Sequence, residues 1–283
     1  MKIIVDSACD LPLSYLEENQ VEILPLFVIM EDKEYVDMYE ITNEKIYDFI
    51  KEGKHPRTSQ VSLEKFYTCF HHLAIQNESS IYIALSSELS GTYQTAMIAY
   101  NQIKEQFPDW DLRIIDSQNA SLGIALMVRE AVEMLENGFS LDEIEQRVRF
   151  MVDHTVSLFT VQDLNYLAEG GRLSKSGAFL GSLLNIHPLL QVVDGKLIPQ
   201  EKFRGRKRVL NRMYERLEKE ADQLKEQTIL IVHTNDHEAV QEIKEYITQN
   251  MKPAEIIDYP IGAVISAHTG MGTIGIFYLN QFE

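Results

Sequence analysis

The fold is decided by a stretch that runs from Ser80 to Glu136, SIYIALSSELSGTYQTAMIAYNQIKEQFPDWDLRIIDSQNASLGIALMVREAVEMLE. Two short apolar runs, residues 80–85 and 112–116, alternate with two longer helical patterns, residues 92–106 and 121–136. Strands that alternate with helices in this way are typical of a mostly parallel sheet covered by helices on both faces. The stretch therefore predicts an α/β fold.

The same pattern extends toward the N-terminus. Apolar periodicity predicts strands over 3–5 and 21–30 and helices over 11–18, 43–51 and 63–76. Asp10 and Pro12 stand where the first turn of the helix over 11–18 should be. Beyond Glu136, Ser140 and Glu143 form a capping box that predicts a helix over 141–152.

The pattern changes near Asp153-His154, which predicts a boundary between an N-terminal α/β domain, 1–153, and a C-terminal α+β domain, 154–283. In the second half, Asp194-Gly195 indicates a hairpin turn between two short strands. The other elements expected there are strands and helices at 155–161, 177–184 (helix), 189–193, 196–199, 207–223 (helix), 228–233, 238–249 (helix), 255–259 and 274–279.

The composition excludes several classes of protein. The formal net charge of −17 disfavours nucleic acid and anionic membrane surfaces as partners. The two cysteines, Cys9 and Cys69, are too few for a disulfide scaffold and are expected to be reduced thiols. Asp6 interrupts the first apolar run, which is unlike a signal peptide, and no run reaches the ~18 apolar residues of a membrane span. We therefore expect a cytoplasmic protein without stable membrane insertion.

The loop that follows the strand over 80–85 is rich in hydroxyl groups, with Ser90, Gly91 and Thr92 at the start of the next helix. Ser90 or Thr92 can accept hydrogen bonds from the first free N–H groups of that helix. The same N–H groups, hydroxyls and helix dipole suit a carboxylate or phosphate, and Gly91 allows a close approach. The capping role and the anion site are compatible.

Other polar motifs are weaker when taken alone. The junctions Asp6-Ser7-Ala8-Cys9-Asp10 and Thr58-Ser59-Gln60 could bind a ligand or simply cap helices. Gly170-Gly171-Arg172 offers a forked donor for an oxyanion, or it is a plain turn with a solvated arginine. His268 could donate to a carboxylate or be a structural histidine.

One segment, residues 202–208, carries five cations in an otherwise acidic chain. A solvated surface and a dock for an acidic partner or phosphates are equally good interpretations of it.

Several catalytic signatures are missing from the sequence. Gly270, Gly272 and Gly275 match G-x-G-x-x-G, but only eight residues follow, too few for a dinucleotide-binding unit. There is no phosphate-loop motif, no nucleophile elbow and no H-E-x-x-H. The polar candidates suit holding an anion better than cleaving one.

Taken together and in this order, the motifs resemble the DegV family over the whole chain. The resemblance rests on Asp6-Ser7 with Asp10, Thr58-Ser59-Gln60, Ser86 to Thr92, Gly170-Gly171-Arg172, the Arg204/Arg206 segment and His268-Thr269-Gly270. It implies a bacterial protein that holds a fatty acid in an apolar tunnel between two domains. It also implies a non-catalytic, cofactor-free subunit that presents the carboxylate to a separate fatty-acid kinase, whose acyl phosphate product feeds phospholipid synthesis.

The resemblance also assigns roles to individual residues. Thr58, Ser90 and His268 would contact the carboxylate, with Ser59, Gly91, Thr92 and Thr269 beside them. Arg172 and either Arg204 or Arg206 would face the kinase or its phosphate. Two positions depart from the family pattern: Met271 stands where proline is frequent, and His187 where lysine is frequent.

Two other functions compete with this expectation. One is an enzyme that acts on a small acyl or phosphorylated substrate at the same polar cleft, and the other is an interaction protein that uses its basic segment. The missing nucleophile and phosphate-loop motifs disfavour the first. Polar motifs spread over both halves disfavour the second, because a docking surface needs no converging hydroxyls.

Overall fold

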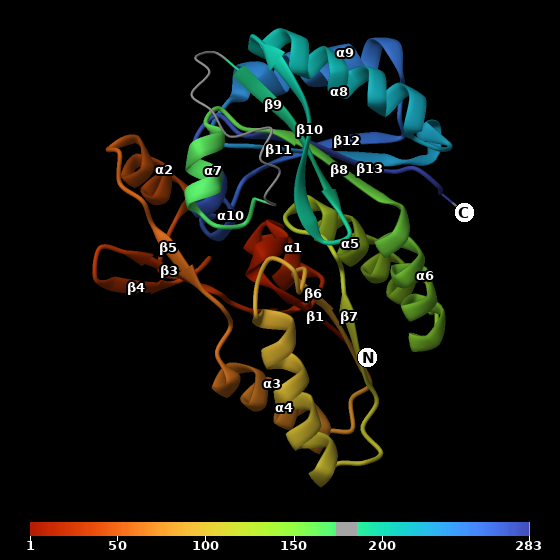
Figure 1. The fold of residues 1–283 in the computed structure, drawn as a ribbon. Helices are drawn as coiled ribbons and strands as arrows, with labels where there is room; N and C mark the ends of the chain where they lie inside the picture. The colour runs from red at the N-terminus through yellow and green to blue at the C-terminus, as the bar shows by residue number, and fades with distance from the viewer. Residues whose placement is uncertain (174–185, 283) are drawn as a thin grey trace.

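A computed structural model describes residues 1–173 and 186–282 of the chain, whose strands form three sheets (Figure 1). The first sheet is parallel and has the order β2-β1-β6-β7. Its strands are β1 (Lys2–Asp6), β2 (Glu22–Leu24), β6 (Ser80–Ala84) and β7 (Leu112–Asp116). The parallel α/β sheet predicted from the sequence is thus confirmed.

The second sheet has six strands in the order β10-β9-β8-β13-β11-β12, and only β11 and β12 are parallel neighbours. Asp194 and Gly195 both have positive φ at the tip of the β9–β10 hairpin, as a tight primed turn requires. The strands are β8 (Thr155–Thr160), β9 (Ile186–Val193), β10 (Lys196–Arg204), β11 (Thr228–His233), β12 (Glu255–Pro260) and β13 (Ile274–Leu279).

A third, antiparallel sheet has the order β4-β3-β5 and was not predicted. It consists of β3 (Phe27–Met30), β4 (Lys33–Val36) and β5 (Arg57–Ser59). The prediction of one strand over 21–30 was wrong, because β2 ends before Pro25, which has no N–H to donate to a sheet. Leu26 N–H donates instead to Ser7 Oγ at 3.1 Å, and the chain leaves the first sheet there.

Most helices agree with the sequence prediction to within a few residues. One expectation was wrong: α1 begins at Leu13 with Pro12 as its N-cap, whereas Asp10 ends the preceding turn η1 with φ 57°. The helix expected over 177–184 lies outside the described residues. The helices are α1 (Leu13–Glu18), α2 (Asn43–Lys51), α3 (Leu63–Ile75), α4 (Thr92–Gln106), α5 (Leu122–Glu136), α6 (Leu141–His154), α7 (Leu164–Glu169), α8 (Arg206–Glu220), α9 (His237–Asn250) and α10 (Ala263–Thr269), with 3₁₀ turns η1 (Ser7–Cys9) and η2 (Leu224–Glu226).

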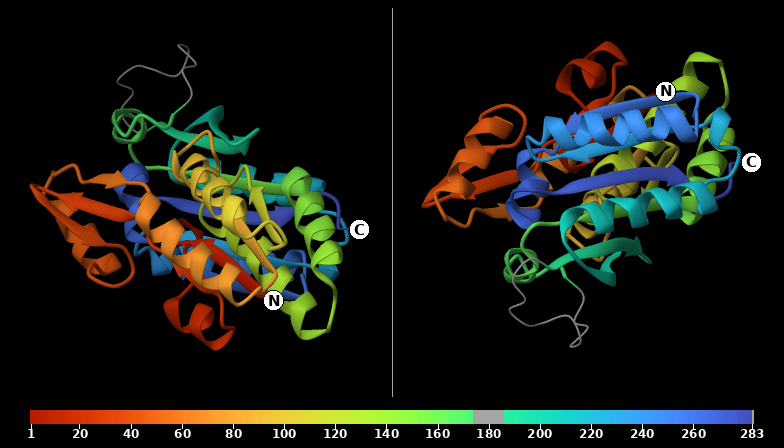
Figure 2. Two further views of the ribbon diagram at one scale, coloured as in Figure 1. Left: turned by 90° about the horizontal axis from the view of Figure 1, so that it is seen from below. Right: turned by 90° about the horizontal axis from the view of Figure 1, so that it is seen from above.

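Helix α5 lies between the two larger sheets. It contacts β1 and β6 on one side and β8, β11 and β13 on the other. A helix that is apolar on all sides must be buried, and the sequence of α5 from Leu122 to Val128 has no charged residue. Helices α8 and α9 cover the outer face of the six-stranded sheet (Figures 1 and 2).

The largest apolar core joins both halves of the chain. Leu230, Val232 and Phe277 of the second half pack in the same cluster as the strands of the first sheet. A second cluster lies under α8 and α9. The proposed division at 153/154 falls at the junction of α6 and β8 and stays a prediction. Within 1–173 and 186–282, no helix has the length and apolar content needed to cross a bilayer.

Candidate functional site

A cavity of about 340 Å³ lies where the carboxyl ends of the parallel strands meet α10 and the six-stranded sheet. Its size is within the usual range of small-molecule pockets, ~300–1,000 Å³. The loops after β6 and β7 supply Leu85, Leu89, Ser90, Gly91, Ala120 and Ser121, and the six-stranded sheet supplies Ser157, Phe159, Val192, Leu197, Val232 and Phe277. Ligands of α/β sheets bind at this edge of the strands.

One part of the cavity wall is polar, where β5 meets α10. Thr58 Oγ1 lies 2.7 Å from His268 Nε2, although 210 residues separate them in sequence. Arg172 lies at the same place and donates from Nη1 to the Gly170 carbonyl at 2.9 Å and from Nε to the Leu89 carbonyl at 3.3 Å. The fold thus brings together three of the residues that the sequence singled out.

His268 is neutral in this environment. Burial, together with a smaller effect of the charge of Arg172, lowers its pKa from 6.5 to about 4. The nearby Gly170 backbone opposes this shift, but Nδ1 makes no well-formed hydrogen bond with any described residue. A neutral imidazole offers one N–H donor and one acceptor. If Nε2 carries the proton and donates to Thr58, the Thr58 hydroxyl is free to donate to a ligand.

The loop before α4 combines capping with access to the cavity. Ser90 Oγ accepts from Thr92 N–H at 3.2 Å and hydrogen-bonds Thr92 Oγ1 at 2.9 Å, which confirms the capping role expected of Ser90. Ser90 and Gly91 line the cavity, whereas Thr92 is buried behind them and is not part of the lining. Gln60 donates to Thr95 Oγ1 at 2.6 Å and packs directly against Gly91.

Two other predicted ligand residues line the cavity with hydroxyls that already have partners. Ser59 donates to Glu34 Oε2 at 3.4 Å, and Thr269 donates to the Ile265 carbonyl at 3.2 Å. Successive residues of a strand point to opposite faces, which accounts for the different partners of Thr58 and Ser59.

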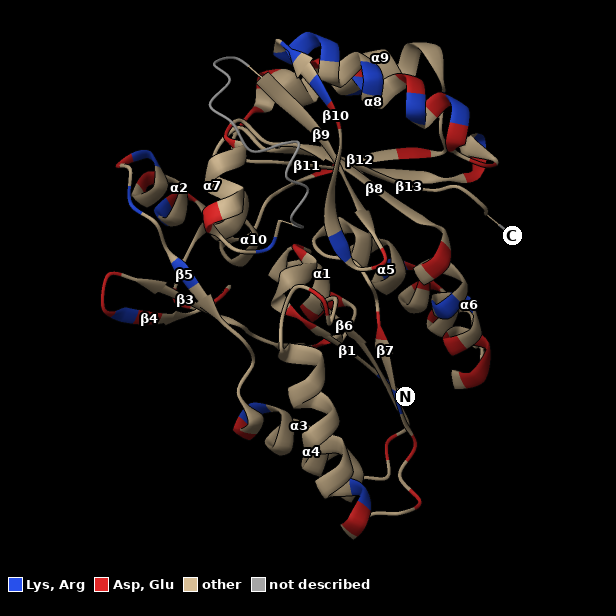
Figure 3. Cartoon of the chain, viewed as in Figure 1, with Lys and Arg blue, Asp and Glu red and all other residues tan. Residues whose placement is uncertain are grey.

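The basic segment lies outside the cavity, at the end of β10 and the start of α8 (Figure 3). Arg206 Nη1 forms an ion pair of 2.5 Å with Asp236, the N-cap of α9. The side chain of Arg204 is exposed and makes no hydrogen bond or ion pair with any described residue. The two arginines that the sequence left undistinguished therefore have different surroundings.

Most of the cavity wall could not be predicted from the sequence. Its apolar residues resemble many other apolar residues of the chain, and Gln60 belongs to a predicted motif but had no predicted role. In contrast, Asp6 and Asp10 do not line the cavity, although they belong to the first polar motif. Both are buried behind its wall.

Comparisons with known proteins agree with this fold and cavity. The family model "Uncharacterised protein, DegV family" matches residues 1–281. A DegV domain-containing protein of Clostridium perfringens is 39% identical over 99% of this chain and 97% of its own length. A fatty acid-binding protein of Thermotoga maritima is 33% identical over 97% of this chain and 96% of its own.

Solved structures give the same result. A DegV family protein from Thermus thermophilus, described as binding fatty acid, superimposes with a TM-score of 0.89 at 31% identity, covering 98% of this chain and 99% of that one. DegV of Bacillus subtilis, described as a fatty acid binding protein, reaches a TM-score of 0.86 at 30% identity, covering 98% and 97% of the two chains. The match in sequence and in fold extends over nearly the whole chain, which therefore belongs to the DegV family.

Proposed function

We propose that this protein binds a long-chain fatty acid, with the carboxylate at Thr58, Ser90 and His268 and the acyl chain along the apolar wall. The observation that carries the proposal is the Thr58–His268 pair at one part of an otherwise mostly apolar cavity. The relatives described as fatty-acid-binding proteins support it.

The energetics suit such a ligand. Burial contributes ~0.8 kcal/mol per methylene, so a chain of ~14 methylenes gains roughly 11 kcal/mol before the costs of association. A carboxylate removed from water needs several hydrogen-bond donors. Hydroxyls at Thr58 and Ser90 can supply them, while the His268 Nε2–H orients the Thr58 hydroxyl and the charge of Arg172 lies nearby.

We further propose that the protein is not itself the catalyst. The Thr58–His268 contact of 2.7 Å is the observation that favours the alternative, an enzyme with threonine as nucleophile and histidine as base. A histidine with a pKa near 4 is a poor base at neutral pH, and no described carboxylate orients its Nδ1. Both features favour a residue that holds an anion.

A separate kinase would then act on the bound carboxylate in the cytoplasm. We propose that Arg172 meets a phosphate group at the carboxylate, because it lines the same cavity and its charge acts on His268. We propose that Arg204 contacts an acidic surface of the kinase, because its side chain is exposed and has no ion pair with any described residue.

Mass spectrometry of an organic extract of the purified recombinant protein tests the binding proposal. We expect a long-chain fatty acid in stoichiometric amount. A parallel extract of His268→Ala should contain less, because the Thr58 hydroxyl loses the partner that orients it toward the carboxylate. A parent protein that stays empty after incubation with fatty acids would refute the proposal and favour the small-substrate enzyme.

A further inference from the structure

The side chain of Asp10 joins two pieces of the cavity wall from behind. Its Oδ2 accepts from the Ser121 hydroxyl at 2.5 Å, and its Oδ1 accepts from Gly262 N–H at 3.0 Å. Ser121 immediately precedes α5, and Gly262 immediately precedes α10. One buried carboxyl group thus ties together two helix starts that are 141 residues apart in sequence.

The joined segments belong to the cavity, whereas Asp10 does not. Ser121 lines it directly, and Ile261 and Val264 line it on either side of Gly262. His268 lies six residues after Gly262, which corresponds to roughly 9 Å along a helix at 1.5 Å per residue. Asp10 therefore acts on a part of the wall remote from the polar Thr58–His268 pair.

Gly262 and the carboxyl group of Asp10 are in direct contact, with no room for a side-chain atom between them. A Cβ added at Gly262 would collide with Asp10 Oδ1, so the start of α10 rests directly on the carboxyl group. Asp10 itself is held in the left-handed conformation, with φ 57°, at the end of η1. Both its position and its two partners are fixed by the fold, and a small displacement of the carboxyl group would move the wall.

We propose that Asp10 is a positioning residue that fixes the apolar part of the cavity wall and thereby limits the length of the acyl chain that fits. The inference rests on the proposed function. Without the carboxyl group, Gly262 N–H and the Ser121 hydroxyl lose their partner, and space opens behind Ser121 and Ile261. Longer acyl chains then gain room, while the contacts of the carboxylate are kept.

The test is a competition among saturated fatty acids of roughly 12 to 20 carbons for the delipidated parent, Asp10→Ala and Asp10→Asn. One methylene can change binding in an apolar pocket about tenfold, so Asp10→Ala should shift the ratio of long to short chains about tenfold toward long chains. Asp10→Asn keeps an acceptor for Gly262 N–H and should keep the parental ratio.

Two further variants separate this effect from a general loss of stability. Leu217→Ala creates a void under α8, away from the cavity, and should leave the chain-length ratio unchanged. Gly262→Ala pushes α10 away from Asp10 and should change the ratio even if Asp10→Ala does not fold. Parental ratios in Asp10→Ala or, should it not fold, in Gly262→Ala would overturn the inference while leaving fatty-acid binding intact. A parent that binds no fatty acid would overturn the proposed function as well.

Discussion

Two adjacent hydroxyl side chains of β5 point to opposite faces of the strand and therefore have different partners. Thr58 meets His268, and Ser59 meets Glu34. If Thr58 holds the ligand carboxylate, Thr58→Val removes a hydrogen bond to a charged group worth ~1.5–3 kcal/mol. We expect fatty-acid affinity to fall about 10- to 100-fold, as measured by calorimetry or by displacement of a fluorescent fatty acid.

Ser59→Ala is the matched control for that change, because it removes a hydroxyl from the adjacent residue of the same strand. Its affinity should stay close to that of the parent. Equal losses in both variants would mean that the strand, and not the Thr58 hydroxyl, determines binding.

The two arginines of the basic segment should respond differently to mutation. Arg204→Ala removes an unpaired exposed charge, so we expect slower acyl phosphate formation in an assay reconstituted with a fatty-acid kinase, with fatty-acid content and stability unchanged. Arg206→Ala breaks the ion pair with Asp236 and should also lower the melting temperature.

Arg149→Ala, a charge change on α6, is the control for net charge. Kinase turnover with Arg204→Ala equal to that with Arg149→Ala would exclude Arg204 as a docking residue.

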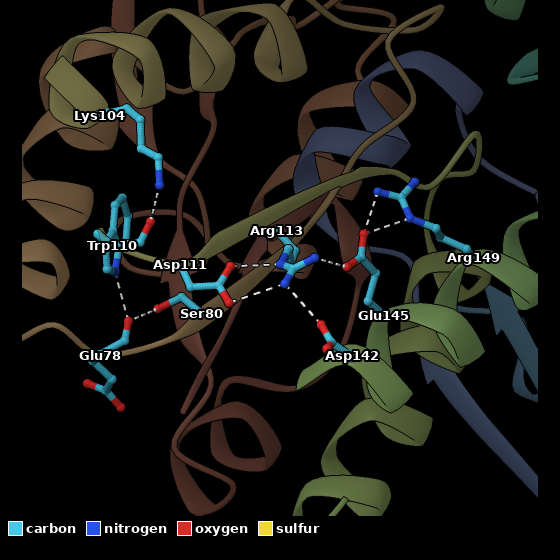
Figure 4. A network of polar contacts seen from close by, with 9 residues as sticks. All are labelled: Glu78, Ser80, Lys104, Trp110, Asp111, Arg113, Asp142, Glu145 and Arg149. Atoms are coloured by element: carbon cyan, nitrogen blue, oxygen red, sulfur yellow. Dashed lines mark hydrogen bonds and ion pairs between the residues drawn. The ribbon is translucent and has the colours of Figure 1, made fainter. Parts of the chain in front are cut away.

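At the scale of elements, Arg113 connects the parallel sheet to α6 (Figure 4). Its guanidinium donates to Asp111 at 2.7 Å, to Asp142 at 2.9 Å and to Glu145 at 2.7 Å. Arg149 contacts only Glu145 in this network and is more exposed. We expect Arg113→Ala to lower the free energy of unfolding by about 1 kcal/mol and Arg149→Ala by a few tenths, measured by urea denaturation. A similar loss in both variants would show that the network adds nothing beyond single surface pairs.

Elements that carry a long periodic pattern could be predicted from the sequence. The bounds of α4, β7, β11 and β13 were predicted to the residue. In contrast, β4 and β5 have only three or four residues, and β5 exists because it pairs with β3, about 30 residues earlier. Helix α10 has only seven residues between Gly262 and Gly270 and gives little periodicity. Such short elements form through tertiary contacts, which local patterns do not encode.

In the candidate site, too, only the residues that follow a local pattern could be predicted from the sequence. Ser90 and Gly91 could be predicted because they follow a buried strand and precede a helix, a place where ligands bind. The pairing of Thr58 with His268 joins β5 and α10, two of the elements that the patterns missed, and only the resemblance to a family indicated it. The apolar wall has no sequence signal of its own.

At the scale of the whole molecule, three buried carboxyl groups lie together behind the cavity. Burial raises the pKa of Asp6 to about 6, of Asp37 to about 7 and of Asp10 to about 8. Asp6 accepts from Leu85 N–H at 2.7 Å, and Asp10 accepts from Ser121 and Gly262, so these two carboxyl groups support the wall from behind. Charge repulsion from Asp37 contributes to the raised pKa of Asp10, after burial.

These raised values determine how the stability of the fold changes with pH. A carboxyl group with a higher pKa in the folded than in the unfolded chain binds its proton more tightly in the folded state. Its contribution to stability is complete below the unfolded value of 3.8 and is lost as the pH rises through the folded value. For Asp10 the loss should extend from pH ~4 to ~8. The lowered pKa of His268 acts in the opposite direction, so the whole-protein curve mixes both effects.

Comparing the parent with Asp10→Asn isolates the contribution of Asp10. The asparagine has nearly the same shape and cannot ionise, so every other titrating group remains in both proteins. We expect the stability of Asp10→Asn relative to the parent to rise with pH by up to ~1.4 kcal/mol per unit between about 4 and 8, and then to level off. Urea denaturation at a series of pH values measures this difference. If the free energy of unfolding changed with pH equally in the two proteins, Asp10 would have an ordinary pKa. Water would then reach the carboxyl group behind the cavity wall.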